Sequence, residues 1–216
     1  MSPTKFALVV AATTPENGIG KAGKLPWHPQ TLKADMNWFK TLTSSHYKLT
    51  SEGKLELQDS STSKPVVVMG RKTWDSIPSK FKPLPKRQNL ILSRTSTSNE
   101  QDEKSLVSIA SSFEDAWKKI ESAHAESVYF IGGSECYKLA LESGKISHLF
   151  LTRIIEPQSL ECDAFFPELS LLASPIDITS QVAELIDQNS TYSPKENCFI
   201  QDTFRYKMFL FALDGK

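Results

Sequence analysis

The sequence predicts one α/β domain with a mostly parallel central sheet, flanking helices and an antiparallel strand at its C-terminal end. Three observations lead to this fold class. Short β-branched or apolar runs alternate with helical patterns along the 216 residues. Several runs are continuously apolar, as in strands that are covered on both faces. The order β, α, β, α, β, β, α, β, α, β is typical of parallel strands joined by crossover helices.

Each element follows from a local pattern. We expect strands at residues 6–13, 65–70, 89–94, 105–110, 127–133 and 148–154, and helices at residues 31–43, 71–77, 112–123 and 134–143. The third helix opens with Ser112-Phe-Glu-Asp115, the pattern of a capping box. Residues 203–213 begin by alternating and are rich in aromatics, which favours a long antiparallel strand. Because the strand pattern resumes after the polar residues 44–64, we interpret these as an exposed excursion of a single domain, 1–216.

The composition excludes several classes of protein. The 25 Lys and Arg residues balance the 25 Asp and Glu residues, so the net charge does not favour nucleic acid or an anionic membrane as a partner. No apolar run reaches the length of a membrane span, and FALVVAA is too short for a typical secretory signal. The three cysteines show no CxxC spacing, which argues against a disulfide framework or a zinc site. We therefore expect a cytoplasmic protein without a bound metal.

One acidic residue lies on the helix face that should be buried. At helical spacing, an apolar stripe is formed by Leu32, Met36, Phe39 and Leu42 or Thr43. Asp35 lies within this stripe, between Leu32 and Met36. A carboxylate on the buried face of a helix is costly unless it is paired. Asp35 is therefore a candidate functional residue.

Several further segments suit a flat or anionic ligand. The glycine-rich residues 17–27 let a ligand approach the backbone, although they lack the GxGxxG order and are more often a surface loop when taken alone. Hydroxyl and cationic groups occur together after two predicted strands, at residues 70–73 and 93–94. They could clamp a phosphate, or they could be solvated basic residues without a ligand. Gly132-Gly133 would admit a phosphate to the backbone or form only a tight turn. Arg87, after a proline-braced turn, could bind a carboxylate, although an exposed Arg without a partner is commoner.

Together these motifs resemble the dihydrofolate reductase family, and its eukaryotic, fungal branch in particular. The matching stretches are LVVAAT, NGIGKAGKLPW, DMNWFK, VVVMGRKTWDSIPSKFKPLPKRQNLILSR, YFIGGSECYKLA, HLFLTRI and ECDAFFPEL. The resemblance thins over residues 44–64, 95–110 and 168–202. It implies an NADPH-dependent reduction of 7,8-dihydrofolate to 5,6,7,8-tetrahydrofolate, with hydride added at C6 and a proton at N5, which supplies one-carbon and thymidylate metabolism.

The resemblance also implies roles for individual residues. Asp35 would pair with the pterin N3–H and 2-amino group, Thr152 would support it, Trp27 would hold a water near it, and Leu25 would close over the nicotinamide. The substrate pocket would consist of Val9, Val10, Ala11, Met36, Phe39, Ile77, Leu84, Ile131 and Arg87, with Arg87 on the glutamate α-carboxylate. NADPH would contact Ala12, Ile19, Gly20, Gly70, Arg71, Lys72, Thr73, Ser93, Arg94, Gly132, Gly133, Ser134 and Glu135. Of these, Arg71, Lys72, Ser93 and Arg94 would surround the 2′-phosphate.

Two features depart from the family's pattern. The seven residues HPQTLKA between Trp27 and Asp35 replace a shorter link, and the acid is Asp, where eukaryotic members usually carry Glu. We expect a slightly shifted helix start but the same acid, because no other Asp or Glu lies between Trp27 and Phe39. The expected ligands are dihydrofolate and antifolates of the 2,4-diaminopyrimidine or pteridine type, bound by a monomer.

Two alternatives remain at this stage. A reductase of the same fold that acts on a riboflavin-pathway pyrimidine would use NADPH but should lack Asp35 and Arg87. A folate-binding protein with degenerate catalysis, or an RNA-binding module, is the second alternative. The neutral net charge and the lack of an aromatic-basic face argue against RNA, and the complete set of site residues argues against lost catalysis.

Overall fold

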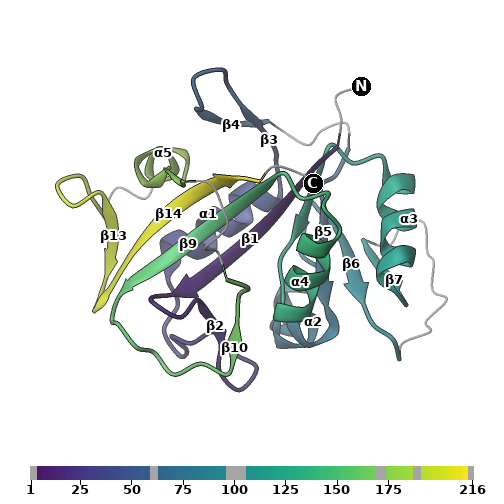
Figure 1. Cartoon of the computed structure of the whole chain (residues 1–216), viewed down its shortest axis with the longest axis horizontal. Coiled ribbons are helices and arrows are strands. Elements are labelled where there is room, and N and C mark those ends of the chain that lie inside the picture. The colour runs from purple at the N-terminus through teal and green to yellow at the C-terminus, as the bar shows by residue number, and fades with distance from the viewer. Residues whose placement is uncertain (1–3, 59–62, 96–105, 169–173, 187–190, 214–216) are drawn as a thin grey trace.

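The structure is a computed structural model that describes residues 4–58, 63–95, 106–168, 174–186 and 191–213. A ten-stranded sheet forms its centre, in the order β12–β13–β14–β9–β1–β8–β5–β6–β7 with β11 beside β14 (Figure 1). Its strands are β1 (Lys5–Thr13), β5 (Val66–Gly70), β6 (Gln88–Leu92), β7 (Val107–Ala110), β8 (Ser127–Phe130), β9 (His148–Glu156), β11 (Ile176–Asp177), β12 (Tyr192–Ser193), β13 (Cys198–Gln201) and β14 (Phe204–Ala212). The strands from β9 to β7 in this order run parallel, and β11 to β14 add antiparallel pairings.

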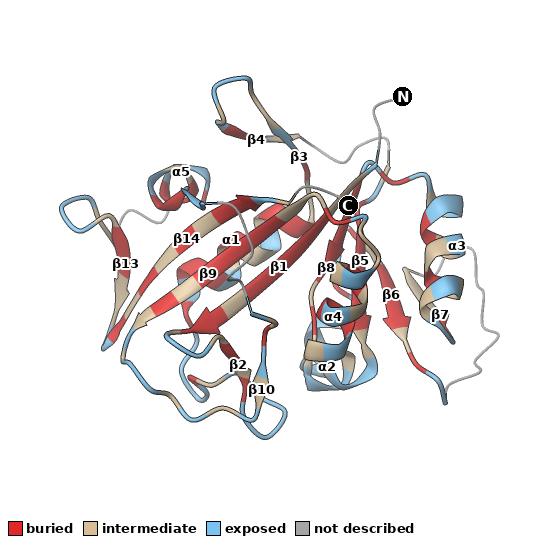
Figure 2. Ribbon diagram, viewed as in Figure 1, coloured by how far each residue is buried: buried red, intermediate tan, exposed pale blue. Residues whose placement is uncertain are grey.

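Helices cover both faces of the sheet. They are α1 (Lys33–Thr43), α2 (Arg71–Ser76), α3 (Phe113–Ala123), α4 (Ser134–Glu142) and α5 (Thr179–Leu185). Two hydrophobic clusters fill the core, one on each face of the sheet. The first cluster packs α1 and α5 against the sheet, and the second cluster packs α3 and α4 against it. Figure 1 shows α4 in front of the sheet and α1 behind it. Figure 2 shows the buried residues running through the central strands, between these helices.

The predicted fold class and its main elements are confirmed. The largest difference at a strand end is in β8, which ends at Phe130 and not at Gly133, although the Ile131 N–H still donates to the Val68 carbonyl of β5 at 2.9 Å. The predicted C-terminal strand is β14, which pairs antiparallel with β9. Two small sheets were not predicted: β2 (Gly18–Gly20) pairs with β10 (Ala164–Phe165), and β3 (His46–Leu49) pairs with β4 (Leu55–Gln58).

The β3–β4 hairpin lies within residues 44–64, which the sequence suggested as an exposed excursion. Its loop is exposed, but Tyr47 and Leu55 are buried in the first hydrophobic cluster. The Tyr47 ring meets Phe150 of β9 edge-on, with 5.1 Å between the ring centroids. These side chains, with the partly buried Leu49 and Leu57, attach an otherwise polar segment to the sheet.

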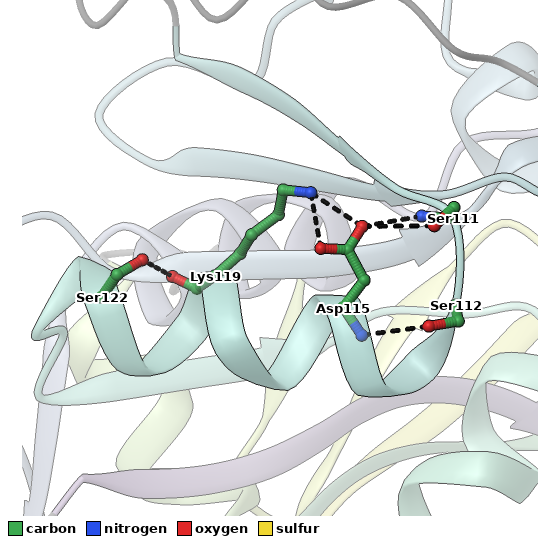
Figure 3. A network of polar contacts seen from close by, with 5 residues as sticks. All are labelled: Ser111, Ser112, Asp115, Lys119 and Ser122. Atoms are coloured by element: carbon green, nitrogen blue, oxygen red, sulfur yellow. Dashed lines mark hydrogen bonds and ion pairs between the residues drawn. The ribbon is translucent and has the colours of Figure 1, made fainter.

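The capping pattern before α3 forms as expected, with one difference. The backbone N–H of Asp115 donates to Ser112 Oγ at 3.1 Å, so Ser112 caps the helix. The Asp115 carboxylate accepts from the backbone N–H of Ser111 at 3.0 Å, one residue before the cap, and pairs with Lys119 at 2.7 Å (Figure 3). These contacts fix the start of a helix that packs on the second cluster, away from α1.

The apolar stripe of α1 is rotated from the predicted one. The buried residues of the helix are Ala34, Asp35, Trp38, Leu42 and Thr43. Met36 is 43% exposed, and Phe39 is half-buried. Trp38 takes the core position instead and meets Phe150 edge-on, with 6.1 Å between the ring centroids. Asp35 keeps its place on the buried face, because it precedes Trp38 by one helical turn.

Candidate active site

The carboxyl ends of three parallel strands bring the predicted anion-binding segments together. Gly70 of β5 pairs with Leu92 of β6, so residues 71–73 and 93–94 leave the sheet side by side. The backbone N–H of Gly70 donates to the Gly132 carbonyl at 2.7 Å, which joins the segment after β8 to the same edge. Ligands of parallel α/β sheets bind at this edge.

Two buried hydroxyl groups at this edge have no hydrogen-bond partner among the described residues. They belong to Ser93, after β6, and Ser134, at the start of α4. A buried polar atom without a partner is costly, so each of these hydroxyls is free to bond a ligand group. Phosphate and ribose oxygens would satisfy both, and the residues present therefore fit a dinucleotide.

The remaining cofactor candidates surround these hydroxyls to different degrees. Lys72 and Arg94 are exposed, and Arg71 forms an ion pair with Asp75 at 3.0 Å. The Gly132–Gly133 bond is cis. A side chain on Gly132, whose φ is 119°, would lie 3.4 Å from the Tyr137 hydroxyl, and one on Gly133 would lie 3.5 Å from Thr73 Oγ1. The φ of Gly132 is one that a residue with a side chain rarely adopts, so this position favours glycine.

Asp35 is buried on the face of the sheet that α1 covers. It is 8% exposed and forms no ion pair with a cation in the described parts of the chain. Burial raises the pKa of Asp35 to about 6, and a hydrogen bond with the Thr152 side chain opposes this rise. The carboxylate is thus neither capped by Lys or Arg nor directed into bulk solvent, and a ligand with hydrogen-bond donors would suit it.

The apolar candidates divide between the two faces of the sheet. Those on the face of α1 are Val9, Ala11, Trp27, Phe39, Ile77, Leu84 and Ile131. Val10 and Ala12 alternate with Val9 and Ala11 along β1, so their side chains pack in the second cluster, as does Ile19. Because their side chains point to the other face, only the main-chain groups of Val10 and Ala12 can contact a ligand beside Asp35. Leu25 is exposed, and Gly20 pairs with Ala164 in the small β2–β10 sheet.

Arg87 is a buried cation with no carboxylate partner among the described residues. It is 2% exposed, and its Nε donates to the Pro85 carbonyl at 3.0 Å. Its guanidinium also donates to Thr43 Oγ1 and lies over the Phe39 ring, 5.8 Å from the centroid. Burial lowers the pKa of Arg87 to about 10. Because Arg87 is not an exposed surface residue and no described carboxylate pairs with it, an anionic ligand group would complete the site.

Residues that the sequence did not single out support this arrangement. Thr43 is buried at the end of α1, donates to the Phe39 carbonyl at 2.6 Å and accepts from Arg87. The Tyr137 hydroxyl donates to the Val9 carbonyl at 2.7 Å, which ties α4 to β1. Thr43 lies four residues after Phe39 on the same helix face, and this spacing is the one signal that could have identified it.

These features define the chain first as a nucleotide-dependent α/β enzyme. A parallel sheet carries unsatisfied hydroxyls at its ligand-binding edge, beside a buried acid and a buried cation on one face. The sequence profile of the family described as "Dihydrofolate reductase" matches residues 53–194. The chain belongs to the dihydrofolate reductase family.

Relatives extend the match over most of the chain. The chain is 40% identical over 211 residues to the dihydrofolate reductase of Encephalitozoon cuniculi, covering 96% of this chain and 97% of the relative. It is 37% identical over 179 residues to that of Candida albicans, covering 81% and 83%. It is 36% identical over 166 residues to that of Mus musculus, covering 75% and 79%. The predicted family and its eukaryotic branch are confirmed, and the riboflavin-pathway alternative is excluded.

Proposed function

We propose that this site reduces 7,8-dihydrofolate to 5,6,7,8-tetrahydrofolate with NADPH, and that Asp35 anchors the pterin. The observation that carries the proposal is a buried carboxylate with no cation to pair with in the described chain. The protonated edge of a pterin offers two neighbouring N–H donors, from N3 and the 2-amino group. A carboxylate accepts both at once, which makes the bond bidentate and charge-assisted.

Asp35 and Thr152 would set the charge beside the substrate. The Thr152 hydroxyl stabilises the ionised form of Asp35, while burial favours the neutral form. An ionised Asp35 next to the ring makes N5 easier to protonate. We assign the proton to a water near Trp27, which is itself buried in the same cluster.

Arg87 would bind the glutamate tail of the substrate. Its guanidinium is held from two sides, by the Pro85 carbonyl and Thr43, and lies beside the Phe39 ring. This fixes its direction before a ligand arrives, which reduces the entropy lost on binding. The α-carboxylate of the tail would supply the missing anion.

NADPH supplies the hydride when it is bound. Ser93, Ser134 and Thr73 would hold its phosphate and ribose oxygens, with Lys72 and Arg94 providing positive charge at the rim. The protein's own part is to align the two rings and to exclude water from the space between them.

Other properties follow as proposals of the same kind. We assign the chain one domain, a monomeric state, a cytoplasmic location and affinity for 2,4-diaminopyrimidine and pteridine antifolates. No helix within the described ranges is long and apolar enough to cross a membrane. Protonated diaminopyrimidines would form an ion pair with Asp35.

A spectrophotometric assay tests the proposed activity. Dihydrofolate should cause loss of NADPH absorbance, and NADH should be a much poorer donor because it lacks the 2′-phosphate. If dihydrofolate caused no loss of NADPH absorbance in a folded sample, the proposed function would be wrong.

A further inference from the structure

The helix that carries Asp35 begins without a cap of its own. The N-cap residue of α1 is Leu32, whose side chain makes no capping hydrogen bond. The first helical bond runs from the Met36 N–H to the Leu32 carbonyl at 3.0 Å. The N–H groups of residues 33–35 precede this bond and have no acceptor within the helix. The turn that holds the candidate acid therefore depends on groups from elsewhere in the chain.

Gln201, at the end of β13, supplies one of these groups. Its Oε1 accepts from the Lys33 backbone N–H at 2.8 Å, and its Nε2 donates to the Thr31 carbonyl at 2.6 Å. One planar amide thus holds the backbone on both sides of Leu32. It also ties down the longer link between Trp27 and Asp35, in which the helix begins at Lys33, two residues after its predicted start.

Tyr206, on the other strand of the same hairpin, packs in the same hydrophobic cluster as Ala34 in the first turn of α1. It pairs with Phe199 of β13, and the two rings stack with 5.5 Å between centroids. Its buried hydroxyl has no hydrogen-bond partner of good geometry among the described residues. Burial and the charge of Asp35 raise the pKa of Tyr206, and the backbone N–H groups of Ala34 and Asp35 oppose this rise. The phenolic oxygen thus lies near the amides of the first turn of α1 without a well-formed hydrogen bond to them.

We propose that Gln201 and Tyr206 are positioning residues for the reduction of dihydrofolate. The β13–β14 hairpin replaces the missing cap of α1, and so fixes the depth and angle at which Asp35 meets the pterin. A further tie, from Asn37 Nδ2 to the Ile186 carbonyl at 3.1 Å, holds the same helix to the end of α5. Both positioning residues act through Asp35, so this inference rests on the function proposed above.

Three substitutions and a matched control test the inference. Gln201→Ala removes the cap, and Tyr206→Phe removes only the hydroxyl. Gln201→Glu keeps an acceptor for Lys33 and adds a negative charge that a helix N-terminus favours. The control is Gln181→Ala, because Gln181 Oε1 accepts from the Leu55 N–H at 3.0 Å, a bond of the same kind between α5 and β4.

We expect these substitutions to weaken the use of dihydrofolate and to leave the binding of NADPH unchanged. On the scale of a lost helix cap, Gln201→Ala should lower kcat/KM for dihydrofolate by about 3- to 10-fold. Tyr206→Phe should lower it by a smaller factor, because its hydroxyl forms no well-oriented hydrogen bond to lose. The KM for NADPH should stay within about twofold of the parent in both variants. Gln201→Glu should recover part of the loss, because it keeps the acceptor for Lys33 but loses the donor to the Thr31 carbonyl. Calorimetric binding of 2,4-diaminopyrimidine should weaken by a similar factor in Gln201→Ala, which gives a comparison without turnover.

The pH profile separates positioning from a purely structural role. Because burial keeps the pKa of Asp35 high, a loosened first turn that admits water should move the pKa in the profile of kcat/KM downward. Gln181→Ala should lower the melting temperature without this shift. If Gln201 is only structural, its Ala variant will behave like the control.

Each outcome decides one of the two proposals. Equal kcat/KM for dihydrofolate and equal pH profiles in Gln201→Ala, Tyr206→Phe and Gln181→Ala would overturn the positioning role. A parent protein without dihydrofolate-dependent oxidation of NADPH would instead overturn the proposed function. If Gln201→Ala fails to fold, Tyr206→Phe decides alone, since its ring still stacks on Phe199.

Discussion

Replacing Asp35 with Asn removes the charge of the candidate acid and keeps its shape. The amide cannot accept both pterin N–H groups, and it does not favour a proton at N5. We expect turnover near neutral pH to fall by roughly 10²–10⁴-fold, the scale of general acid–base contributions. Turnover is measured from the loss of NADPH absorbance at saturating dihydrofolate.

The same substitution should make the protein more stable at neutral pH. Burial raises the pKa of Asp35 from its ordinary 3.8 to about 6. The folded state therefore binds this proton more tightly than the unfolded state, so stability is lost as the pH rises from about 4 to about 6. At about 1.36 kcal/mol per pKa unit, the ionised Asp35 costs up to about 3 kcal/mol at pH 7. Asn carries no charge, so the variant avoids this cost.

Urea unfolding of the ligand-free protein at pH 4 and pH 7.5 checks the stability argument. The free energies of unfolding of parent and variant should differ little at pH 4, and the variant should exceed the parent at pH 7.5. Glu114→Gln is the control, because Glu114 is an exposed carboxylate in the first turn of α3. Near-parental turnover in Asp35→Asn, or a variant less stable than the parent at pH 7.5, would refute the reasoning.

Three further substitutions address the rest of the site. Arg87→Gln should lower kcat/KM for dihydrofolate by at least about 30-fold, which is the cost of losing one partner of a buried charge pair. It should not affect kcat/KM for a pterin substrate without a glutamate tail, and an equal loss with both substrates would contradict this. Thr152→Val should raise the pKa of Asp35 further, because the hydrogen bond with Thr152 lowers this pKa. The pH profile of kcat/KM should therefore move to higher pH, and a move to lower pH would be inconsistent with that bond. Ser134→Ala should raise the urea midpoint of the ligand-free protein or leave it unchanged, because its buried hydroxyl has no partner among the described residues. It should also raise the KM for NADPH about threefold, and an unchanged KM would place the hydroxyl away from the cofactor.

The sequence predicted the sheet well because its strands are continuous apolar runs. VVVMG at residues 66–70 and the capping pattern at Ser112 are local signals, and each formed where expected. The phase of α1 was wrong because Met36 is apolar but exposed, and periodicity cannot distinguish exposed apolar residues from those that fill a core. The β3–β4 hairpin was missed because its only buried residues, among those described, are His46, Tyr47 and Leu55, and polar residues surround them.

The candidate site was predictable where one residue breaks a pattern. Asp35 interrupts an apolar helix face, and Arg87 precedes a buried strand, so each was identified as a candidate from the sequence alone. Gln201 and Tyr206 gave no such signal, because their importance comes from contact with a helix more than 160 residues earlier in the chain. Consecutive residues of β1 were also assigned to one pocket, although side chains of a strand alternate between faces.

The order of strands has a consequence for folding while the chain is synthesised on the ribosome. β1 is made first, yet it lies between β8 and β9, pairing Lys5 with Ser127 and Ala7 with His148. Its apolar residues thus remain without either neighbour until translation has passed the middle of the chain. Contacts so distant in sequence form slowly, and the waiting segment is open to unwanted association. Assembly of the sheet therefore belongs to the late stage of synthesis, when chaperones that shield nascent apolar segments would matter most.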